Sequence, residues 1–480
     1  MVVLDKVKIA VIDNGVAEDL LKQPLEYKVY IDNTNCCVVD DEHMELSGFI
    51  HGTICAMIIE NNFSECMLSS VKILNEDGIG KVDKLKIALD WCYQNNIFLV
   101  NLSLGMTHFH DRAIIRNVIN YYANRGMIII AASANSGYKT YPASLSNAIG
   151  VAAGKKFEVN TDLQKQKGID FMALSDHEIK IEGNVFRLGK SNSYAAPYVT
   201  AMIGNLLKRK PHSDVASIRR KLLPEIEMTT FLYYPDWIET AWVSERCEQS
   251  EGKYYFKEIK GELEVSIPMI DTIVVKDRAE VIKYYNKKKH IVYLGKEPIE
   301  HMVSDRYFWS REQRVAQIIS CKEKTSDIDI PIIICEFVEK QDIILWLSEL
   351  RDCFGKDGYN VYTMSNKIES VLYDLEFMPD ELCCESTMEQ VNNFLYWQTY
   401  YCQSDAILLG LDTSVNSNIN VFETIADILI KVNDTNGAVK TKVYCDGKME
   451  IERIFERIDN RTINVLYREI LKLFTEDTDE

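Results

Sequence analysis

Several features that mark other classes of protein are missing from this 480-residue sequence. No run approaches the eighteen or so apolar residues that a membrane-spanning helix needs, so we expect no membrane partner. The start has no basic segment followed by an apolar one, because Asp5, Lys6 and Lys8 interrupt it, and we therefore expect a cytoplasmic protein. With 47% hydrophobic and 26% charged residues, the chain is typical of a globular protein with two or three domains.

The thirteen cysteines contain no CxxC motif. The adjacent pairs Cys36-Cys37 and Cys383-Cys384 have no zinc-site spacing around them. An odd number of cysteines without a secretion signal indicates reduced thiols that pack as small hydrophobes. The acidic cluster at residues 40–42 is a conceivable calcium site, but its ligand spacing is unconvincing. We predict no metal and no other cofactor.

Basic residues are also too few for a nucleic-acid-binding protein. Lys and Arg number 54 against 72 Asp and Glu, which gives a net charge of −18. The two signs balance over residues 1–225, so the imbalance belongs to the second half. Because phosphate groups are neutralised by Lys and Arg, this surface argues against nucleic acid and fits solubility or a basic partner.

The stretch GKSNSYAAPYVTAMIGNLL, residues 189–207, indicates an exposed loop that turns into a helix near Ser193. A serine nucleophile needs a neighbouring base and gains from a helix N-terminus, where negative charge is favoured. Ser193 is therefore a candidate nucleophile, although serine is also a common N-cap. Pro197 falls in or just past the first turn, where we expect little or no backbone hydrogen bonding to be lost.

Two other stretches carry candidate partners for this serine. The apolar run at residues 7–16 ends in Asp13 and the turn-forming pair Asn14-Gly15, which is typical of a strand reaching the ligand-binding edge of an α/β sheet. Such an aspartate could equally hold a ribose or a metal. His51 opens an apolar helix, and Gly52 leaves room for another group to approach the imidazole. A lone histidine there is often structural.

The order Asp13, His51, Ser193 is that of the subtilisin group. Three further segments fit the same family, and over about residues 5–225 the chain resembles the subtilisin-like serine peptidases, or subtilases. Those segments are 71–105, 127–137 and 140–153.

This resemblance implies an Asp-His-Ser triad and an oxyanion hole. The oxyanion donors would be the side chain of Asn135 and the backbone N–H of Ser193. Asn135 could also be a simple turn residue. The fold implied is a parallel α/β sheet with helices on both faces, and strands at 68–74 and 97–104 around a helix at 82–95 fit it.

The resemblance also implies that substrate is held as an added strand between two edge segments. The residues of these segments are Gly78, Ile79, Gly80, Ser103, Leu104 and Gly105.

The sequence departs from the family pattern close to the expected site. Ser191-Asn192 replace the usual glycine and threonine before the nucleophile, and Ala134 and Thr140 stand where glycine is common. Ala134 and Thr140 would add atoms near the P1 pocket, so we predict a shallow pocket that prefers Gly, Ala or Ser at P1.

The second half begins with a linker or packing segment at 226–253. From residue 254, apolar runs typical of strands and helices alternate, which predicts an acidic second α/β domain with a mainly parallel sheet. Residues 338–341 follow a strand in the arrangement of a phosphate loop, but they lack glycine and include an acid, which disfavours nucleotide binding. A helix is predicted over 420–432.

The sequence thus predicts an intracellular serine endopeptidase acting on a peptide or protein substrate. The second half of the chain distantly resembles accessory domains of bacterial peptide-maturation systems. This resemblance suggests processing of a precursor, such as the removal of a leader peptide. The alternatives are a degraded, peptide-binding pseudoprotease and a regulatory scaffold. The oligomeric state is left open.

Overall fold

The computed structural model describes most of the chain. The described residues are 6–32, 34–39, 50–75, 77–155, 158–159, 167–181, 183–211, 213–222, 234–299, 306–338, 341–414, 420–435, 438–456 and 459–476. The acidic cluster at 40–42 and residues 339–340 of the loop considered for phosphate lie outside them, as do residues 226–233 of the predicted linker.

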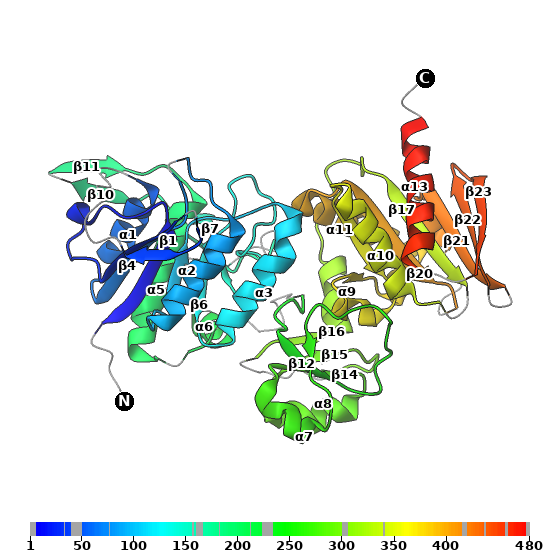
Figure 1. The fold of residues 1–480 in the computed structure, drawn as a ribbon, viewed down its shortest axis with the longest axis horizontal. Helices are drawn as coiled ribbons and strands as arrows, with labels where there is room; N and C mark the ends of the chain where they lie inside the picture. The colour runs from blue at the N-terminus through cyan, green and yellow to red at the C-terminus, as the bar shows by residue number, and fades with distance from the viewer. Residues whose placement is uncertain are drawn as a thin grey trace. The chain divides into compact units, whose positions relative to one another are not determined.

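The chain forms two compact units (Figure 1). Among the described residues, unit 1 contains those up to Glu239 together with Arg306 and Tyr307, and unit 2 contains the rest. Residues 234–239 pack within unit 1, where Trp237 stacks on Tyr307 with ring centroids 4.9 Å apart. Residues 240–243 are already a strand of unit 2. The structure therefore divides the segment 226–253, which the sequence analysis treated as one piece.

Unit 1 is built on a nine-stranded sheet in the order β3-β2-β4-β1-β5-β6-β7-β9-β8. All neighbouring strands are parallel except the two edge pairs, β2–β3 and β8–β9. A separate antiparallel hairpin pairs β10 with β11. The strands are β1 (Val7–Asp13), β2 (Tyr27–Ile31), β3 (Cys37–Val39), β4 (Cys66–Lys72), β5 (Leu99–Leu102), β6 (Ile128–Ala132), β7 (Ile149–Gly154), β8 (Glu158–Val159), β9 (Phe171–Leu174), β10 (Glu178–Ile181) and β11 (Asn184–Arg187).

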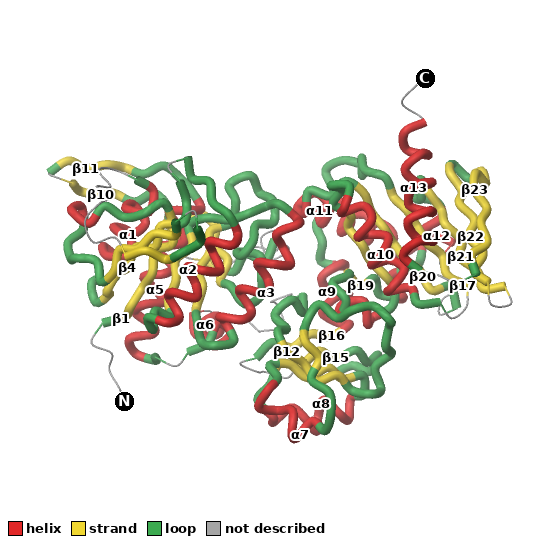
Figure 2. Tube along the Cα trace, viewed as in Figure 1, coloured by secondary structure: helices red, strands yellow, loops and turns green. Residues whose placement is uncertain are grey.

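Helices cover both faces of this sheet (Figure 2). Because side chains alternate along a strand, Ile9 and Val11 join the core under α1 and α5, whereas Ala10 and Ile12 join the core under α2 and α3. Helix α6 packs in the first of these cores. The helices are α1 (His51–Asn62), α2 (Val82–Gln94), α3 (Arg112–Ala123), α5 (Asn192–Arg209) and α6 (Val215–Leu222). The predicted α/β fold is confirmed.

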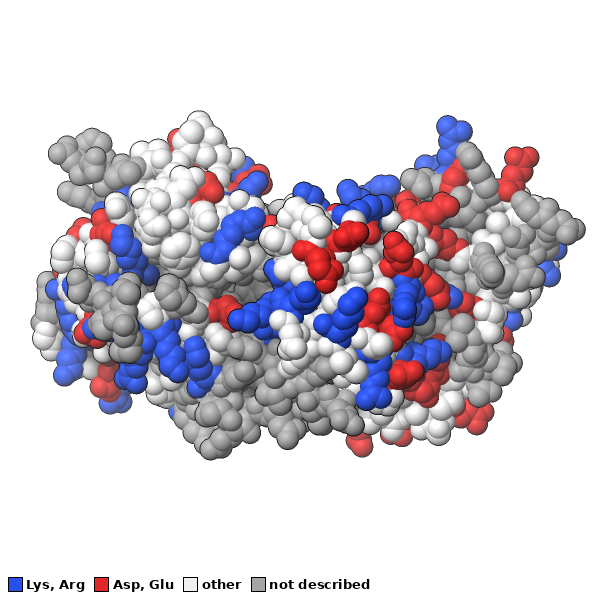
Figure 3. Space-filling model, turned by 90° about the horizontal axis from the view of Figure 1, so that it is seen from below, with Lys and Arg blue, Asp and Glu red and all other residues white. Residues whose placement is uncertain are grey.

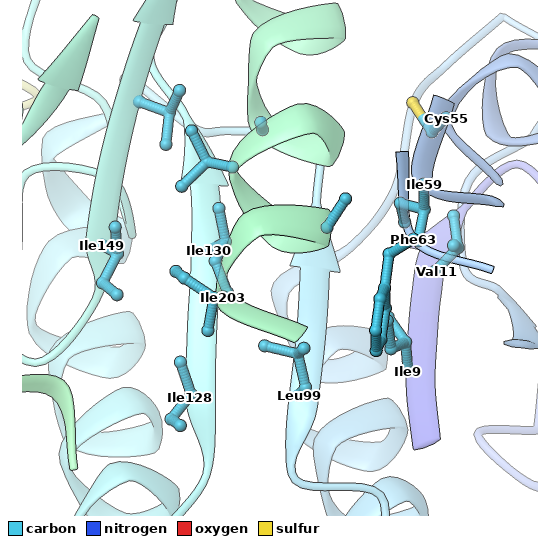
Figure 4. Close-up of a cluster of buried hydrophobic side chains, with 14 of the residues drawn as sticks. Ile9, Val11, Cys55, Ile59, Phe63, Leu99, Ile128, Ile130, Ile149 and Ile203 are labelled. Carbon is cyan, nitrogen blue, oxygen red and sulfur yellow. The ribbon is translucent and has the colours of Figure 1, made fainter. Parts of the chain in front are cut away.

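The core under α1 and α5 is closely packed (Figure 4). Ile203 of α5 lies beside Ile130 of β6, and Phe63, which ends α1, lies beside Ile9 of β1. A Cβ at Gly204 would lie 2.7 Å from the Phe63 ring. Glycine is therefore needed there for the end of α1 to pack against α5.

The strand order places a switch point at β1. After β1, the chain forms β2 and β4 on one side of it and then crosses to form β5 on the other side. Ligand-binding crevices in open α/β sheets form at the carboxyl ends of strands at such a point. The carboxyl end of β1 carries Asp13.

Unit 2 contains two sheets instead of the single one predicted. A fully parallel five-stranded sheet has the order β13-β12-β14-β15-β16, and a seven-stranded sheet has the order β19-β18-β20-β17-β21-β22-β23. The strands are β12 (Thr240–Val243), β13 (Lys257–Glu258), β14 (Thr272–Val275), β15 (His290–Tyr293), β16 (Phe308–Ser310), β17 (Ile332–Val338), β18 (Val361–Ser365), β19 (Glu376–Phe377), β20 (Ala406–Asp412), β21 (Ile428–Thr435), β22 (Ala438–Cys445) and β23 (Lys448–Phe455). The helices are α7 (Leu263–Ser266), α8 (Arg278–Tyr284), α9 (Arg311–Ile319), α10 (Ile343–Lys356), α11 (Met388–Cys402), α12 (Asn420–Glu423) and α13 (Asn460–Glu476).

The helix predicted over 420–432 was wrong. Only the short α12 forms at its start, and β21 follows from Ile428. Ile428, Ile430 and Val432 alternate with more exposed residues, which is the two-residue period of a strand. Pairing with β17 on one side and β22 on the other decides the conformation.

The surface has the charge distribution expected from the sequence. On the face shown in Figure 3, acidic side chains gather over unit 2, with basic ones among them. In the described part of the chain, no helix has the length and apolar character needed to cross a lipid bilayer.

Arg219 of α6 is the buried cation that joins several parts of unit 1. Its Nε and Nη2 each lie 2.8 Å from a carboxylate oxygen of Asp170, and its Nη1 donates to the carbonyl of Ser146 and the hydroxyl of Tyr307. Arg219→Ala should lower the free energy of unfolding by about 3–5 kcal/mol, because Asp170 is left buried without its partner. Urea unfolding followed by circular dichroism measures this.

The matched control is Arg187→Ala. Arg187 pairs with Glu178 in the same unit, but its side chain is 83% exposed. Exposed pairs contribute less than about 1 kcal/mol, so this variant should unfold close to wild type. Equal losses in the two variants would contradict the role given to Arg219.

Candidate active site

The carboxylate of Asp13 is buried and fixed at the end of β1. It is 1% exposed, and its Oδ1 accepts the backbone N–H of Asn14 at 2.8 Å. The Asp13 carbonyl accepts the backbone N–H groups of Ile73 and Leu74, which follow the neighbouring strand β4. These bonds hold the backbone of Asp13 against β4 and leave its carboxylate able to accept a further hydrogen bond.

That partner is His51, the first residue of α1. Its Nδ1 lies 2.9 Å from Asp13 Oδ2 and 3.0 Å from Oδ1. The side chain of His51 is 32% exposed, so one side of the imidazole contacts solvent while the other contacts a buried carboxylate. This arrangement fixes the ring orientation and makes Nδ1 the protonated nitrogen.

Gly52 permits this contact. Its N–H donates to the side-chain oxygen of Asn14 at 3.0 Å, and a Cβ at this position would lie 2.3 Å from the carbonyl oxygen of Gly15. The glycine thus makes room for the backbone turn after Asp13 and for Asp13 itself, whose Cβ would lie 3.1 Å from the added atom. Any larger residue would push the start of α1, and His51 with it, away from β1.

Ser193 lies in the first turn of α5, which contacts the start of α1. The Tyr194 ring stacks on the imidazole with centroids 5.7 Å apart, and Cys55, one helical turn after His51, donates its thiol to the Ser193 carbonyl at 3.7 Å. Burial and the Asp13 charge raise the pKa of Cys55 well above its usual range, so the thiol stays protonated as a donor.

The Ser193 carbonyl lacks its usual hydrogen-bond donor within the helix. In an α-helix it would accept the N–H of residue 197, but Pro197 has none. The Ser103 hydroxyl fills the gap by donating at 2.8 Å, and Ser103 in turn accepts from Asn101 at 3.0 Å. The expectation that Pro197 costs little or no backbone hydrogen bonding was wrong, because Pro197 lies inside α5 and removes one intrahelical bond. A tertiary contact from Ser103 replaces that bond.

Asn135 follows β6 and lies at the start of α5. It is exposed, and its Oδ1 accepts the backbone N–H of Asn192 at 3.1 Å. An amide that accepts through Oδ1 keeps its Nδ2 group as a donor. The side chain of Asn192 bridges the same elements, since it donates to the carbonyls of Ser133 and Ala134 and accepts the N–H of Ala153.

Ala134 and Thr140, the residues predicted to shape the P1 pocket, contact each other. The Thr140 hydroxyl accepts the backbone N–H of Ala134 at 2.8 Å. The methyl of Thr140 lies against Gly105, where a Cβ would come within 2.1 Å of it. Thr140 is buried, so neighbouring atoms hold its methyl group in place against Gly105.

The two predicted substrate-binding segments, 78–80 and 103–105, differ in the exposure of their residues. Ile79 is 68% exposed, but its N–H donates to the Asn75 side chain at 2.8 Å and its carbonyl accepts the Asn75 N–H at 3.0 Å. Gly78 is in the same turn, and Gly80 borders a pocket of about 720 Å³. In the other segment Ser103 is buried under Ser193, Leu104 is half-buried and Gly105 is exposed.

The sequence model of the Subtilase family matches residues 5–233. This match identifies a subtilase segment. The minor extracellular protease Epr of Bacillus subtilis is 27% identical over 46% of this chain and 35% of its own length. Subtilisin BL of Lederbergia lenta is 28% identical over 32% of this chain and 58% of its own length. The chain thus spans from about a third to somewhat over half of the length of these curated relatives.

Among solved structures, Sphericase is similar at 21% sequence identity. The similarity covers 47% of this chain and 85% of the Sphericase chain, with a TM-score of 0.38.

Sequence reasoning missed part of the candidate site. Cys55 and Asn101 were not singled out, and Ser191 and Asn192 were noted only as departures from the family pattern. The spacing of Cys55 from His51 was the available signal for the first, since residues four apart share a helix face. The role of Asn101 depends on a contact between β5 and α5 that no local pattern shows.

Three side chains of the candidate site carry atoms that could ligate a metal ion. In the described part of the chain, Asp13, His51 and Cys55 form the group whose carboxylate, imidazole and thiol atoms lie within 4.8 Å of one another. The imidazole Nδ1 of this group already bonds to Asp13.

Two opposing effects act on the pKa of His51. Burial lowers it, but the hydrogen bond and charge of Asp13 outweigh burial and raise the pKa above its ordinary value of 6.5. A raised pKa means that the pair stabilises the fold below pH 6.5, and that this contribution is lost as the pH rises through the folded-state pKa.

Asp13→Asn should therefore lower the pKa of His51, because burial then acts without the opposing carboxylate. Histidine ring NMR signals followed against pH measure the change. His177 is the internal control, since burial lowers its pKa and its Nε2 contacts backbone carbonyls of Leu174 and Tyr194. A His51 titration that stays unchanged in Asp13→Asn would contradict the proposed coupling.

Proposed function

We propose that this protein is a serine endopeptidase whose triad is Asp13, His51 and Ser193. The observation that carries the proposal is the contact of a buried carboxylate with the imidazole Nδ1, at 2.9 Å, beside the start of α5. This contact orients the second ring nitrogen as a base, and the family match over residues 5–233 supports a nucleophile at Ser193.

In the proposed mechanism, His51 removes the proton of the Ser193 hydroxyl as that oxygen attacks the scissile carbonyl. Asp13 stabilises the imidazolium that forms, and His51 later gives the proton to the leaving amine. The Nδ2 group of Asn135 and the backbone N–H of Ser193 receive the oxyanion. Water then releases the acyl group by the same steps.

Substrate would bind as an extended strand along Ser103, Leu104 and Gly105, with the 78–80 turn opposite. The exposed Gly105 offers its backbone, whereas Ser103 contributes by holding Ser193. The packing of Thr140 against Gly105 and its bond to Ala134 support a shallow P1 pocket for small side chains.

The setting we propose is the cytoplasm, with a specific peptide or protein precursor as substrate. None of the thirteen cysteines, all of which the structure describes, forms a disulfide, which fits a reducing compartment. Removal of a leader peptide in a bacterial peptide-maturation pathway is the form of processing we propose, with the acidic unit 2 restraining activity or recruiting that precursor.

One observation favours a second candidate, a peptide-binding pseudoprotease or regulatory scaffold. The backbone N–H of Ser193, needed as an oxyanion donor, bonds to the Ser191 hydroxyl at 3.3 Å. A site whose donor is permanently occupied would bind peptide by strand addition without cutting it.

A fluorophosphonate probe separates these candidates, because it labels a serine only when a competent base activates it. The full chain should be labelled, and Ser193→Ala should lose the label completely. Ser136→Ala, at an exposed serine beside Asn135, should be labelled as wild type. Label retained by Ser193→Ala would place the reactive serine elsewhere and contradict the triad.

Thr140→Ser tests the P1 pocket, because it removes the methyl that faces Gly105 and keeps the hydroxyl that bonds to Ala134. Tetrapeptide anilides that differ only in P1 should show a wild-type preference for Ala over Phe. That preference should fall by about tenfold in Thr140→Ser, since one methyl-sized space is worth about 1–3 kcal/mol.

Thr140→Val is the matched variant, because it keeps the methyl and loses the hydroxyl. It should keep the preference for P1 Ala even if it is less stable. Faster wild-type cleavage after Phe than after Ala would show that the pocket is not shallow.

A further inference from the structure

The start of α5 uses each of its first three backbone N–H groups internally. Asn192 donates to the Asn135 side chain at 3.1 Å, Ser193 to the Ser191 hydroxyl at 3.3 Å, and Tyr194 to the Ser191 carbonyl at 3.1 Å. The first N–H groups of a helix have no intrahelical partner, which is why helix N-termini bind anions. Here the chain itself satisfies the groups that an oxyanion would need.

Ser191 has the geometry of a helix cap. Its backbone is extended, with φ −151° and ψ 139°, and its side chain is the acceptor for the N–H of Ser193. One N–H group makes one strong hydrogen bond. The Ser191 oxygen and an oxyanion bonded at Ser193 would therefore compete for the same donor.

The neighbouring Asn192 offers no substitute donor. Its Nδ2 group bonds to the carbonyls of Ser133 and Ala134 and to the Ser133 hydroxyl, and its Oδ1 accepts the N–H of Ala153. The side chain is thus held between β6, β7 and α5. The N–H of Ser193 and the Nδ2 group of Asn135 remain the donors on which the proposed reaction depends.

We propose that Ser191 is a positioning residue. In the resting site its hydroxyl keeps the backbone N–H of Ser193, the oxyanion donor, hydrogen-bonded and unavailable. This inference rests on the proposed endopeptidase function. As the Ser193 oxygen bonds to the scissile carbon and its proton passes to His51, the carbonyl π electrons move to the carbonyl oxygen. That charged oxygen displaces Ser191, because a charge-assisted hydrogen bond is stronger than one to a neutral hydroxyl.

The displacement has a kinetic consequence. The oxyanion is present in the transition state and not in bound substrate, so the energy needed to break the Ser191 bond lowers the kcat of the wild type and leaves its KM unchanged. Replacing a serine cap by alanine typically changes stability by about 0.5–2 kcal/mol, which corresponds to a factor of about 2–30 in rate. The cap thus slows turnover while it stabilises the helix.

Ser191→Ala tests this in the full chain, with the second-order rate of fluorophosphonate labelling as readout. The probe's phosphoryl oxygen gains negative charge when Ser193 attacks, so no natural substrate is needed. The variant should be labelled about 2- to 30-fold faster than wild type and should have a lower Tm. Ser191→Thr, which keeps a hydroxyl, should restore the slow rate.

Asp214→Ala controls for the loss of a cap alone. Asp214 accepts the N–H of Ser217 at 2.7 Å at the start of α6, in the same unit but outside the site. This variant should lower Tm without accelerating labelling. A purely structural role for Ser191 would give the same result as Asp214→Ala, with a lower Tm and equal or slower labelling, and would overturn the inference.

The outcomes also separate this inference from the proposed function. Label on wild type that is lost in Ser193→Ala, with no acceleration in Ser191→Ala, keeps the endopeptidase and rejects the role of Ser191. Label that appears only in Ser191→Ala supports both. No label on either protein rejects the endopeptidase function, and the inference with it.

Discussion

The carbonyl oxygen of Ser193 is the constraint around which unit 1 is arranged. Pro197 removes the N–H that this oxygen would accept in a regular helix, and a buried carbonyl without a donor costs about 1–3 kcal/mol. Ser103 supplies the donor from the end of β5, and Thr200 and Asn101 complete a buried polar chain beneath it. The missing bond thus ties the first turn of α5 to the central strands.

A second close approach completes the arrangement. Because Gly52 has no side chain, α1 begins directly against the turn after β1, and His51 reaches the buried Asp13 carboxylate. Cys55, on the same face of α1, contacts the Ser193 carbonyl. Three elements from distant parts of the sequence therefore converge within one cluster of hydrogen bonds, and rigid packing of α1 against α5 holds them there.

The seven-stranded sheet of unit 2 has a switch point of its own. Its strands β18, β20, β17 and β21 are adjacent and parallel, in an order with a switch point beside β17. At the end of β20, Asp412 pairs with Lys367 at 2.6 Å, so the charge at that edge is satisfied within the chain. This internal pairing agrees with the acidic, glycine-free sequence that disfavours a phosphate ligand there.

The sequence by itself determined the main strands and helices around the candidate site of unit 1 and the chemistry of its candidate residues. Alternating apolar runs indicated strands, and the order of Asp13, His51 and Ser193 indicated a known kind of site, because both signals are local or depend only on chain order. It failed at residues 420–432, where pairing with β17 and β22 overrode a helical pattern. Tertiary structure alone decided which donor reaches the Ser193 carbonyl, that Ser191 holds the Ser193 N–H, and where unit 1 ends. Each of these depends on atoms from separate elements meeting within about 3 Å, a distance that no spacing along the chain encodes.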